Sequence, residues 1–228
     1  MVKSVKYVYP SMIVLSILSN IILVVFLSRK FKYKNYELIS MLMADTLGIV
    51  VGGILYTRIL FGGFGFSSLG GVLGSLLFLY VYSLVTKKDF KYIMILFMPS
   101  IPLMYAIGKI GCFVAGCCHG IEYSGLLSIM YSNSLVAPNG INLFPVQIIE
   151  TIVFLIIFIF IIFKYLKSKM SIRLVMFEMI LCGIFKFVLD FFRYSHNGKI
   201  LSTNQIMCLV IIVVGIIYLI RVKKKIKE

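Results

Sequence analysis

Long apolar stretches alternate with short polar ones along the whole chain. A bilayer's hydrocarbon layer is spanned by about 20 helical residues at a rise of about 1.5 Å per residue. The pattern predicts seven helices, at about 11–28, 38–60, 69–85, 92–107, 146–163, 174–192 and 204–220. The fourth is the shortest, so we expect it to be the least able to cross a membrane alone. The sequence therefore predicts an all-α polytopic membrane protein.

Composition supports this interpretation. Of the 228 residues, 61% are hydrophobic and 14% are charged, and the mean hydropathy is +1.06. Water-soluble domains have about 45–50% apolar and about 25% charged residues. Seven spans leave room for short connections and one larger loop, at about 108–145. We therefore expect residues 1–228 to form a single transmembrane domain.

The net charge of +15 would suggest a nucleic-acid partner in a soluble protein, but here it indicates topology. Most Lys and Arg residues fall in alternate connections, at 29–34, 87–91, 164–173 and 221–227. Few fall on the other side: Lys3, Lys6, Arg58, Lys109, Arg193 and Lys199. Because cytoplasmic loops carry the excess of Lys and Arg, we expect the N-terminus outside and the C-terminus in the cytoplasm. We expect no nucleic-acid partner.

Four acidic residues lie inside the predicted spans, where an ionised side chain is costly and is usually paired or functional. They are Asp45, Glu150, Glu178 and Asp190. The sixth predicted helix also carries Lys186, four residues before Asp190, so the two side chains share a face and are expected to pair. Arg193 follows at the outer end of the same face. A structural ion pair with a snorkelling arginine is the alternative to a functional site.

A glycine-rich segment opens the largest predicted loop. Residues 108–120 read G-K-I-G-C-F-V-A-G-C-C-H-G. Its glycines allow a close backbone approach to a ligand, and Lys109 adds a cation among exposed N–H groups. We expect this segment to hold an anionic head group. After the loop, Gln147 and Glu150 lie one turn apart near the start of the fifth predicted helix, which indicates either a polar pocket or ordinary packing polarity.

Three of the five cysteines lie in that segment, at Cys112, Cys117 and Cys118, followed by His119. An odd number of cysteines fixes no disulfide framework. The spacing matches no standard pattern of paired zinc ligands, so we assign no metal ligand here. A disulfide from Cys112 to one of the other two is the alternative to simple packing.

Five segments together resemble one known family. Besides 108–120, residues 66–74 read F-S-S-L-G-G-V-L-G, 145–150 read P-V-Q-I-I-E, 186–193 read K-F-V-L-D-F-F-R and 201–205 read L-S-T-N-Q. In this order they are similar to the motifs of the bacterial prolipoprotein diacylglyceryl transferases, whose signature is G-R-x-G-N-F-x-N-x-E-x-x-G. That family also has seven spans with the N-terminus outside.

The resemblance implies an activity: transfer of a diacylglyceryl group from phosphatidylglycerol to the lipobox cysteine of a preprolipoprotein, with release of glycerol phosphate. Lys109 and Lys186 stand where the family has arginines that hold the lipid phosphate, and Asp190 stands where a glutamate does. These three are the predicted catalytic residues. The predicted substrate-binding residues are Lys109, Gly111, Cys112, Gly116, Gly120, Gln147, Glu150, Lys186 and Arg193. We expect no cofactor.

Besides these substitutions at 109, 186 and 190, the chain departs from the family pattern at other positions. Leu69 replaces a histidine thought to assist deprotonation of the thiol, Cys112 replaces the signature asparagine, and Cys117 replaces the following glutamate. His119, Cys117 or Cys118 are candidate substitutes for the missing base. The prediction is a transferase in the plasma or inner membrane, with its site facing the extracytoplasmic leaflet.

Three rival functions stay open. One is a divergent transferase that uses a different acceptor, and another is a non-catalytic protein that binds anionic phospholipid. The third, a transporter, is suggested by Asp45, Glu150 and Glu178, but no paired interrupted helices indicate inverted repeats.

Overall fold

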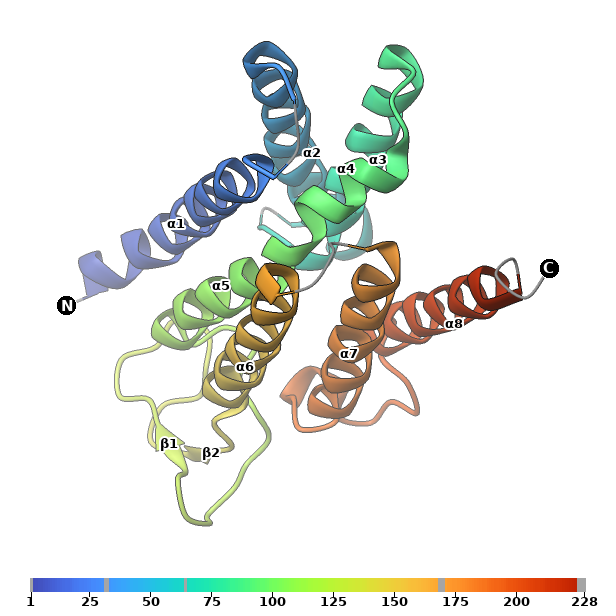
Figure 1. Cartoon of the computed structure of the whole chain (residues 1–228). Helices are drawn as coiled ribbons and strands as arrows, with labels where there is room; N and C mark the ends of the chain where they lie inside the picture. Colours follow the sequence, from blue (N-terminus) through green and yellow to red (C-terminus); the bar gives the residue numbers. More distant parts are fainter. Residues whose placement is uncertain (1, 31–32, 64, 168–170, 225–228) are drawn as a thin grey trace. The chain divides into compact units, whose positions relative to one another are not determined.

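The computed structural model describes residues 2–30, 33–63, 65–167 and 171–224 (Figure 1). Helices make up nearly all of the regular structure in these residues. The chain divides into two compact units. One contains the chain up to Ser16 and everything from Pro102 onward, and the other is Ile17–Ile101.

The Ile17–Ile101 unit contains the C-terminal part of α1 and the next three helices (Figure 1). Its elements are α1 (Val2–Ser28), α2 (Asn35–Phe61), α3 (Ser68–Thr86), α4 (Phe90–Phe97) and the short 3₁₀ helix η1 (Met98–Ser100). The backbone N–H of Gly70 donates to the Ser67 hydroxyl at the start of α3. Because such a cap satisfies a backbone group that has no partner within the helix, the segment 66–74 begins a helix at this point.

Glycines let α2 and α3 pack with their backbones in contact. A Cβ atom on Gly74 would lie 2.1 Å from the carbonyl oxygen of Gly48, and one on Gly52 would lie 2.4 Å from that of Gly70. Small residues at four-residue spacing are how membrane helices achieve such close contact. The glycines at 70 and 74 therefore serve helix packing in this unit.

Asp45 is the centre of a buried polar network in the same unit. It is 2% exposed. Its carboxylate accepts hydrogen bonds from Asn20 Nδ2, at 2.6 Å, and from the Ser75 hydroxyl. The Ser100 hydroxyl donates to Asn20 Oδ1 at 2.6 Å. These bonds connect α1, α2, α3 and η1, so they give Asp45 a structural role.

The other unit holds the C-terminal helices and the largest loop. Its elements after residue 101 are α5 (Ile101–Ala115), β1 (Ile129–Met130), β2 (Asn142–Leu143), α6 (Val146–Lys167), α7 (Ile172–Asp190), the 3₁₀ helix η2 (Tyr194–His196) and α8 (Thr203–Lys224). The two strands pair antiparallel within the α5–α6 loop, with Ile129 opposite Leu143. Helix α7 packs against both α6 and α8.

A capping box begins α8. The backbone N–H of Gln205 donates to Ser202 Oγ at 3.1 Å, and the backbone N–H of Ser202 donates to Gln205 Oε1 at 2.9 Å. This reciprocal pair satisfies two backbone donors at the helix start. Gln205 Nε2 also donates to the Phe187 carbonyl, at 3.2 Å, which ties α8 to α7.

The fourth predicted helix differs most from the structure. It was expected at 92–107, but the helical segment extends over Phe90–Ala115, with 3₁₀ geometry at Met98–Ser100. The prediction that the loop begins at Gly108 was therefore wrong, because residues 108–115 continue α5 and the loop starts at Gly116. Both Gly108 and Gly111 are helical, and a helix tolerates isolated glycines at a cost of about 1 kcal/mol each.

The chain is an all-α polytopic membrane protein. Six of the described helical segments are long and apolar enough to cross a membrane. Helix α7 has 19 residues, about 28 Å, but its charges keep it out of this group. The count of seven crossings and their orientation stay predictions, as does the single-domain organisation.

Candidate functional site

Glu150 lies at the centre of a buried ionic cluster in the unit that contains the C-terminal helices. It projects from α6 and is 0% exposed. Its carboxylate lies 3.1 Å from Lys109 Nζ and 3.0 Å from Lys186 Nζ. Arg193 Nη2 lies 2.7 Å from each of its two oxygens. The Tyr105 hydroxyl donates a further hydrogen bond, at 2.9 Å. One carboxylate therefore receives donors from α5, α7 and the segment after α7.

Asp190 is the second carboxylate of the cluster. It is buried and lies 3.3 Å from Lys186 Nζ, which confirms the predicted pairing along α7. Arg193 Nε lies 3.6 Å from the same oxygen. The Ser202 hydroxyl donates to the other oxygen. Asp190 thus contacts both Lys186 and Arg193, which also contact Glu150, and Ser202 at the start of α8 hydrogen-bonds to Asp190.

The cluster has one more positive charge than negative. Three cations, Lys109, Lys186 and Arg193, meet two carboxylates. Burial alone would lower the pKa of Arg193, but the Glu150 carboxylate raises it well above its ordinary value, so the guanidinium stays charged. A buried uncompensated charge is costly. The Lys186 side chain is the most exposed of the three cations, at 15% against 6% for Lys109 and 5% for Arg193.

The α5 helix supplies two side chains to the cluster from one face. Tyr105 and Lys109 are four residues apart, which places them one above the other. Lys109 Nζ lies 5.0 Å from the centre of the Tyr105 ring, within cation–π range. Tyr105 also accepts a hydrogen bond from Arg193, at 3.3 Å. The Tyr105 ring therefore contacts Lys109, and the Tyr105 hydroxyl bonds to both Arg193 and Glu150.

Arg193 is held in place by backbone hydrogen bonds to the α5–α6 loop. The N–H of Tyr194 donates to the His119 carbonyl at 3.1 Å, and the N–H of Ile121 donates to the Phe192 carbonyl at 3.0 Å. These bonds flank Arg193 and fix the direction in which it leaves α7. The loop residues after Cys118 therefore act as a scaffold for the arginine.

Gly120 is required for this scaffold. It forms an antiparallel bridge with Arg193. A Cβ atom on Gly120 would lie 2.2 Å from the Phe144 carbonyl oxygen, closer than real Cβ contacts allow. Any other residue would displace either the segment before α6 or the segment that carries the arginine.

Two other predicted substrate-binding glycines have structural surroundings. A Cβ on Gly111 would lie 2.8 Å from the side chain of Met12, so this glycine lets α1 and α5 approach within the unit. Gly116 has φ of +71°, a left-handed conformation that favours glycine, and it ends α5. Their roles in substrate binding stay predictions.

Gln147 carries an unsatisfied buried acceptor. The side chain is 0% exposed, and its Nε2 donates to the Cys117 carbonyl at 3.0 Å. Within the described part of the chain, its Oε1 has no hydrogen-bond partner. A buried unsatisfied acceptor costs about 1–3 kcal/mol. Gln147 thus joins the cysteine turn to α6 and keeps one oxygen free for a donor.

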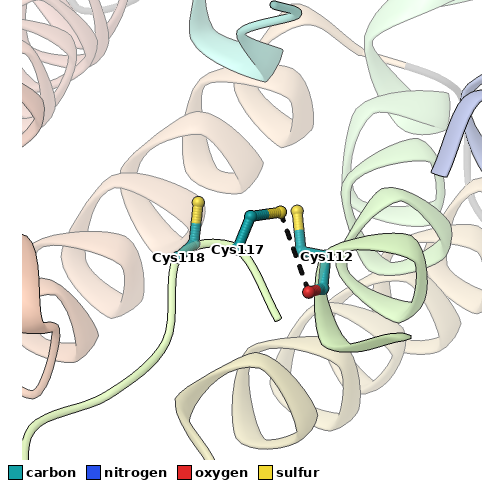
Figure 2. Close-up of side chains that lie close together, drawn as sticks. All are labelled: Cys112, Cys117 and Cys118. Atoms are coloured by element: carbon teal, nitrogen blue, oxygen red, sulfur yellow. Dashed lines mark hydrogen bonds between the residues drawn. The ribbon is translucent and has the colours of Figure 1, made fainter. Parts of the chain in front are cut away.

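Cys112, Cys117 and Cys118 converge at the end of α5. Their sulfur atoms all lie within 4.8 Å of one another. Figure 2 shows the Cys117 side chain pointing toward Cys112, with Cys117 Sγ 3.7 Å from the Cys112 carbonyl oxygen. All three are free thiols in this structure. The thiols of Cys112 and Cys117, and then the cations Lys109 and Arg193, lower the pKa of Cys118 well below its ordinary value.

Three residues singled out from the sequence lie outside the ionic cluster. Asp45 and Leu69 belong to the Ile17–Ile101 unit, where Asp45 has the structural partners described above and Leu69 lies half-buried in the first turn of α3. Glu178 lies on α7 and is 2% exposed. Among the described residues, neither of its carboxylate oxygens has a hydrogen-bond partner. Of the four acids inside spans, only Glu150 and Asp190 therefore form the cluster.

Sequence reasoning missed two members of the cluster. Tyr105 looked like one more aromatic residue in an apolar span, although its four-residue spacing from Lys109 was an available signal. Ser202 was part of a matched motif, but its bond to Asp190 depends on where α8 begins relative to α7. The predicted convergence of Lys109, Glu150, Lys186 and Arg193 is present in the structure.

The fold and the cluster define a polytopic membrane protein with a buried, net cationic site. Comparison with known proteins gives the family. The model of the prolipoprotein diacylglyceryl transferase family matches residues 4–221, and the chain belongs to this family. The predicted resemblance is thereby confirmed.

Several named relatives are similar over long stretches. The phosphatidylglycerol–prolipoprotein diacylglyceryl transferase of Clostridium tetani is 30% identical over 225 residues, covering 92% of this chain and 90% of that protein. The phosphatidylglycerol–prolipoprotein diacylglyceryl transferase 2 of Clostridium perfringens is 31% identical over 157 residues, which cover 68% of this chain and 61% of that protein. That of Dehalococcoides mccartyi is 30% identical over 73% of this chain and 65% of that protein.

Proposed function

We propose that the chain transfers the diacylglyceryl group of phosphatidylglycerol to the cysteine thiol of a prolipoprotein. The names of its relatives give both substrates. The observation that carries the proposal is the buried cluster of Lys109, Lys186 and Arg193 around Glu150 and Asp190, with its single excess positive charge. The phosphodiester of phosphatidylglycerol has a single negative charge. Its binding would make the cluster neutral.

Lys109 and Lys186 are the residues that would touch the phosphate. Each ammonium has three donor hydrogens, and the Glu150 contact engages only part of them. When the C–O bond of the lipid breaks, negative charge grows on the departing phosphate. Cations fixed in a site that excludes water stabilise such charge more than water does. The two lysines therefore stabilise the leaving group, and Glu150 and Asp190 position them.

The cluster residues stabilise charge in this reaction, and they form no covalent bond and transfer no proton. The acceptor sulfur forms a bond to the terminal glyceryl carbon of the diacylglycerol part, and the bond from that carbon to the phosphate oxygen breaks. The bonding pair leaves with the oxygen as glycerol phosphate. The proton of the thiol is matched by the proton that the released phosphate monoester takes up.

Gln147 is suited to accept a hydrogen bond from the lipid head group. Its buried Oε1 lacks a donor among the described residues, and Gln147 lies one turn before Glu150 on α6. A glycerol hydroxyl would supply that donor. This contact would distinguish phosphatidylglycerol from an anionic lipid whose head group has no hydroxyl at that place.

The site's location in the cell belongs to the same proposal. We place the protein in the plasma or inner membrane with seven crossings, the N-terminus outside and the cluster facing the extracytoplasmic leaflet. The distribution of Lys and Arg along the sequence supports this orientation.

Leu69 favours two of the rival functions. It occupies the place of the family's histidine and cannot take a proton. A protein that binds phosphatidylglycerol without transferring its diacylglyceryl group, or that uses another acceptor, would fit this substitution.

The proposal is tested by incubating the purified full chain in detergent with labelled phosphatidylglycerol and a lipobox peptide. We expect equal amounts of released glycerol phosphate and lipidated peptide. Release without lipidation would instead support another acceptor. Retained lipid with neither product would support the binding function.

A further inference from the structure

The turn after α5 brings three cysteines together from a short stretch of chain. Cys112 lies in the last turn of α5, and Cys117 and Cys118 follow Gly116 in the loop (Figure 2). Gly116 and Cys118 both have positive φ, of 71° and 54°. A left-handed conformation costs a residue with a Cβ roughly 1–2 kcal/mol. The backbone thus folds back on the helix end and directs these sulfurs to one place.

The spacing of the sulfurs fits a metal ion. On a tetrahedral ion with metal–sulfur bonds of about 2.3 Å, two sulfurs lie roughly 3.8 Å apart. The three sulfurs already lie within 4.8 Å of one another, so small side-chain rotations bring them to that spacing. A disulfide would join two of them and leave the third without a partner, whereas one ion engages all three. Soft thiolate ligands select thiophilic ions such as Zn²⁺.

The surrounding charges fit the same ion. Three thiolates and one divalent cation have a net charge of −1. Lys109 and Arg193 both interact electrostatically with Cys118. These cations would stabilise a metal–thiolate group of that charge beside the ionic cluster.

The three cysteines would leave the fourth coordination position of a tetrahedral ion open. His119 is not close enough to join the three sulfurs, and its Nδ1 lies 3.1 Å from the Gly120 carbonyl oxygen. Cys118 is exposed, so the ion can be approached from its side. Catalytic zinc sites characteristically have three protein ligands and one open position, and a thiol that ligates zinc loses its proton.

We propose that Cys112, Cys117 and Cys118 bind one thiophilic divalent ion of the Zn²⁺ class, whose open position takes the acceptor thiol. The part concerning the acceptor rests on the proposed transferase function. The metal–sulfur bond forms as the thiol releases its proton to water. The thiolate sulfur then attacks the glyceryl carbon. As the carbon–sulfur bond forms, the carbon–oxygen bond breaks and its electron pair leaves with the phosphate, and the thioether product dissociates from the ion. The ion would thus promote deprotonation of the acceptor thiol, which Leu69 cannot do.

The first test counts the metal. The full chain is purified with a reductant that does not bind metals, equilibrated with Zn²⁺, separated from free ion and analysed by mass spectrometry for zinc. We expect about one ion per chain and an affinity that falls by about a hundredfold or more in Cys118→Ser, beyond the loss typical of outer-shell changes. Cys182→Ser is the matched control, because this free cysteine lies on α7 outside the cluster, and it should retain the ion. Wild-type binding no stronger than that of Cys118→Ser would overturn the site.

The second test examines the open position with Co²⁺, whose visible spectrum reports its ligands. Adding a lipobox peptide should change the spectrum of the Co²⁺-loaded chain, and a peptide with Ser in place of the acceptor Cys should not. Identical spectra with both peptides would overturn the role of the ion in binding the acceptor.

Activity measurements separate this inference from the proposed function. If chelator-treated protein transfers the diacylglyceryl group as fast as metal-loaded protein, the catalytic role of the ion is wrong and the transferase function stands. If the ion binds and its spectrum responds to the thiol but no lipidated peptide forms, the metal site stands and the transferase function is wrong.

Discussion

Arg193 Nη2 lies 2.7 Å from both carboxylate oxygens of Glu150, in a part of the site with almost no exposed surface. A residue that follows α7 is thereby joined to the second turn of α6. Lys109 and Lys186 contact the same carboxylate, so Glu150 organises all three cations. Removing its charge would leave these cations facing one another.

We therefore expect Glu150→Gln to destabilise the fold. Breaking a buried ion pair by removing one partner typically costs about 3–5 kcal/mol, because the remaining charges are left buried and uncompensated. The free energy of unfolding, measured by denaturant titration in detergent, should fall by about this amount. Glu122→Gln is the control, because Glu122 is exposed in the α5–α6 loop, and it should change stability little. Equal stability of the two variants would contradict the ionic account.

Gly120→Ala and Gly108→Ala separate two roles for the glycines of the signature segment. The added Cβ at Gly120 would meet the Phe144 carbonyl, whereas nothing lies within 4 Å of one at Gly108. We expect Gly120→Ala to lower both stability and transfer, because it displaces the segment that holds Arg193. Gly108→Ala should keep or raise stability, by up to about 1 kcal/mol, because alanine favours a helix interior.

The Gly108→Ala variant also tests the predicted ligand role of this segment. If it abolishes transfer while leaving thermal stability unchanged, the space beside Gly108 belongs to a substrate. If transfer is retained, the glycine is not needed for substrate approach.

Part of this site could be predicted from the sequence, because part of it lies on single helices. The spacing of Lys186 and Asp190 places them on one face of α7, and their predicted pair is present, whereas Arg193 lies beyond the end of this helix. Nothing in the spacing shows that Glu150, on α6, becomes their common partner. That contact depends on how α6 and α7 pack. Only the motif resemblance placed Lys109 in the same site.

The glycine-rich segment shows a second reason why sequence alone did not predict the whole site. Glycine lowers helix propensity, so 108–115 was predicted as loop, but tertiary packing overrides this weak preference. Gly111 packs against Met12, which compensates for the missing side chain. The convergence of the three cysteines was likewise hidden, because it depends on left-handed backbone at Gly116 and Cys118.

Ser202→Ala should weaken the junction of α7 and α8. The variant removes the acceptor that caps α8 and a donor to Asp190. Loss of a helix cap typically costs about 1 kcal/mol. We expect a fall of at least this size in the free energy of unfolding. Thr203→Ala, at the neighbouring exposed position, is the control, and an equal loss there would contradict the assignment of the cap.

Glu178→Met should stabilise the protein. Glu178 is buried on α7, and the described residues offer its carboxylate oxygens no hydrogen bond. An unsatisfied buried polar group costs about 1–3 kcal/mol, and methionine has a similar length without that cost. The thermal midpoint should rise with transfer activity unchanged. A large loss of activity at unchanged or higher stability would show that Glu178 serves a function.

The central claim is that three cations and two carboxylates leave one positive charge for the phosphate of an anionic lipid. It is tested most directly by the equilibrium affinity of the detergent-solubilised chain for phosphatidylglycerol, compared between wild type, Lys186→Gln and Lys186→Arg. We predict that Lys186→Gln lowers this affinity by about tenfold or more, equivalent to about 1.4 kcal/mol. Lys186→Arg should retain most of it, because the charge is kept. Equal affinity of wild type and Lys186→Gln for phosphatidylglycerol would contradict the account.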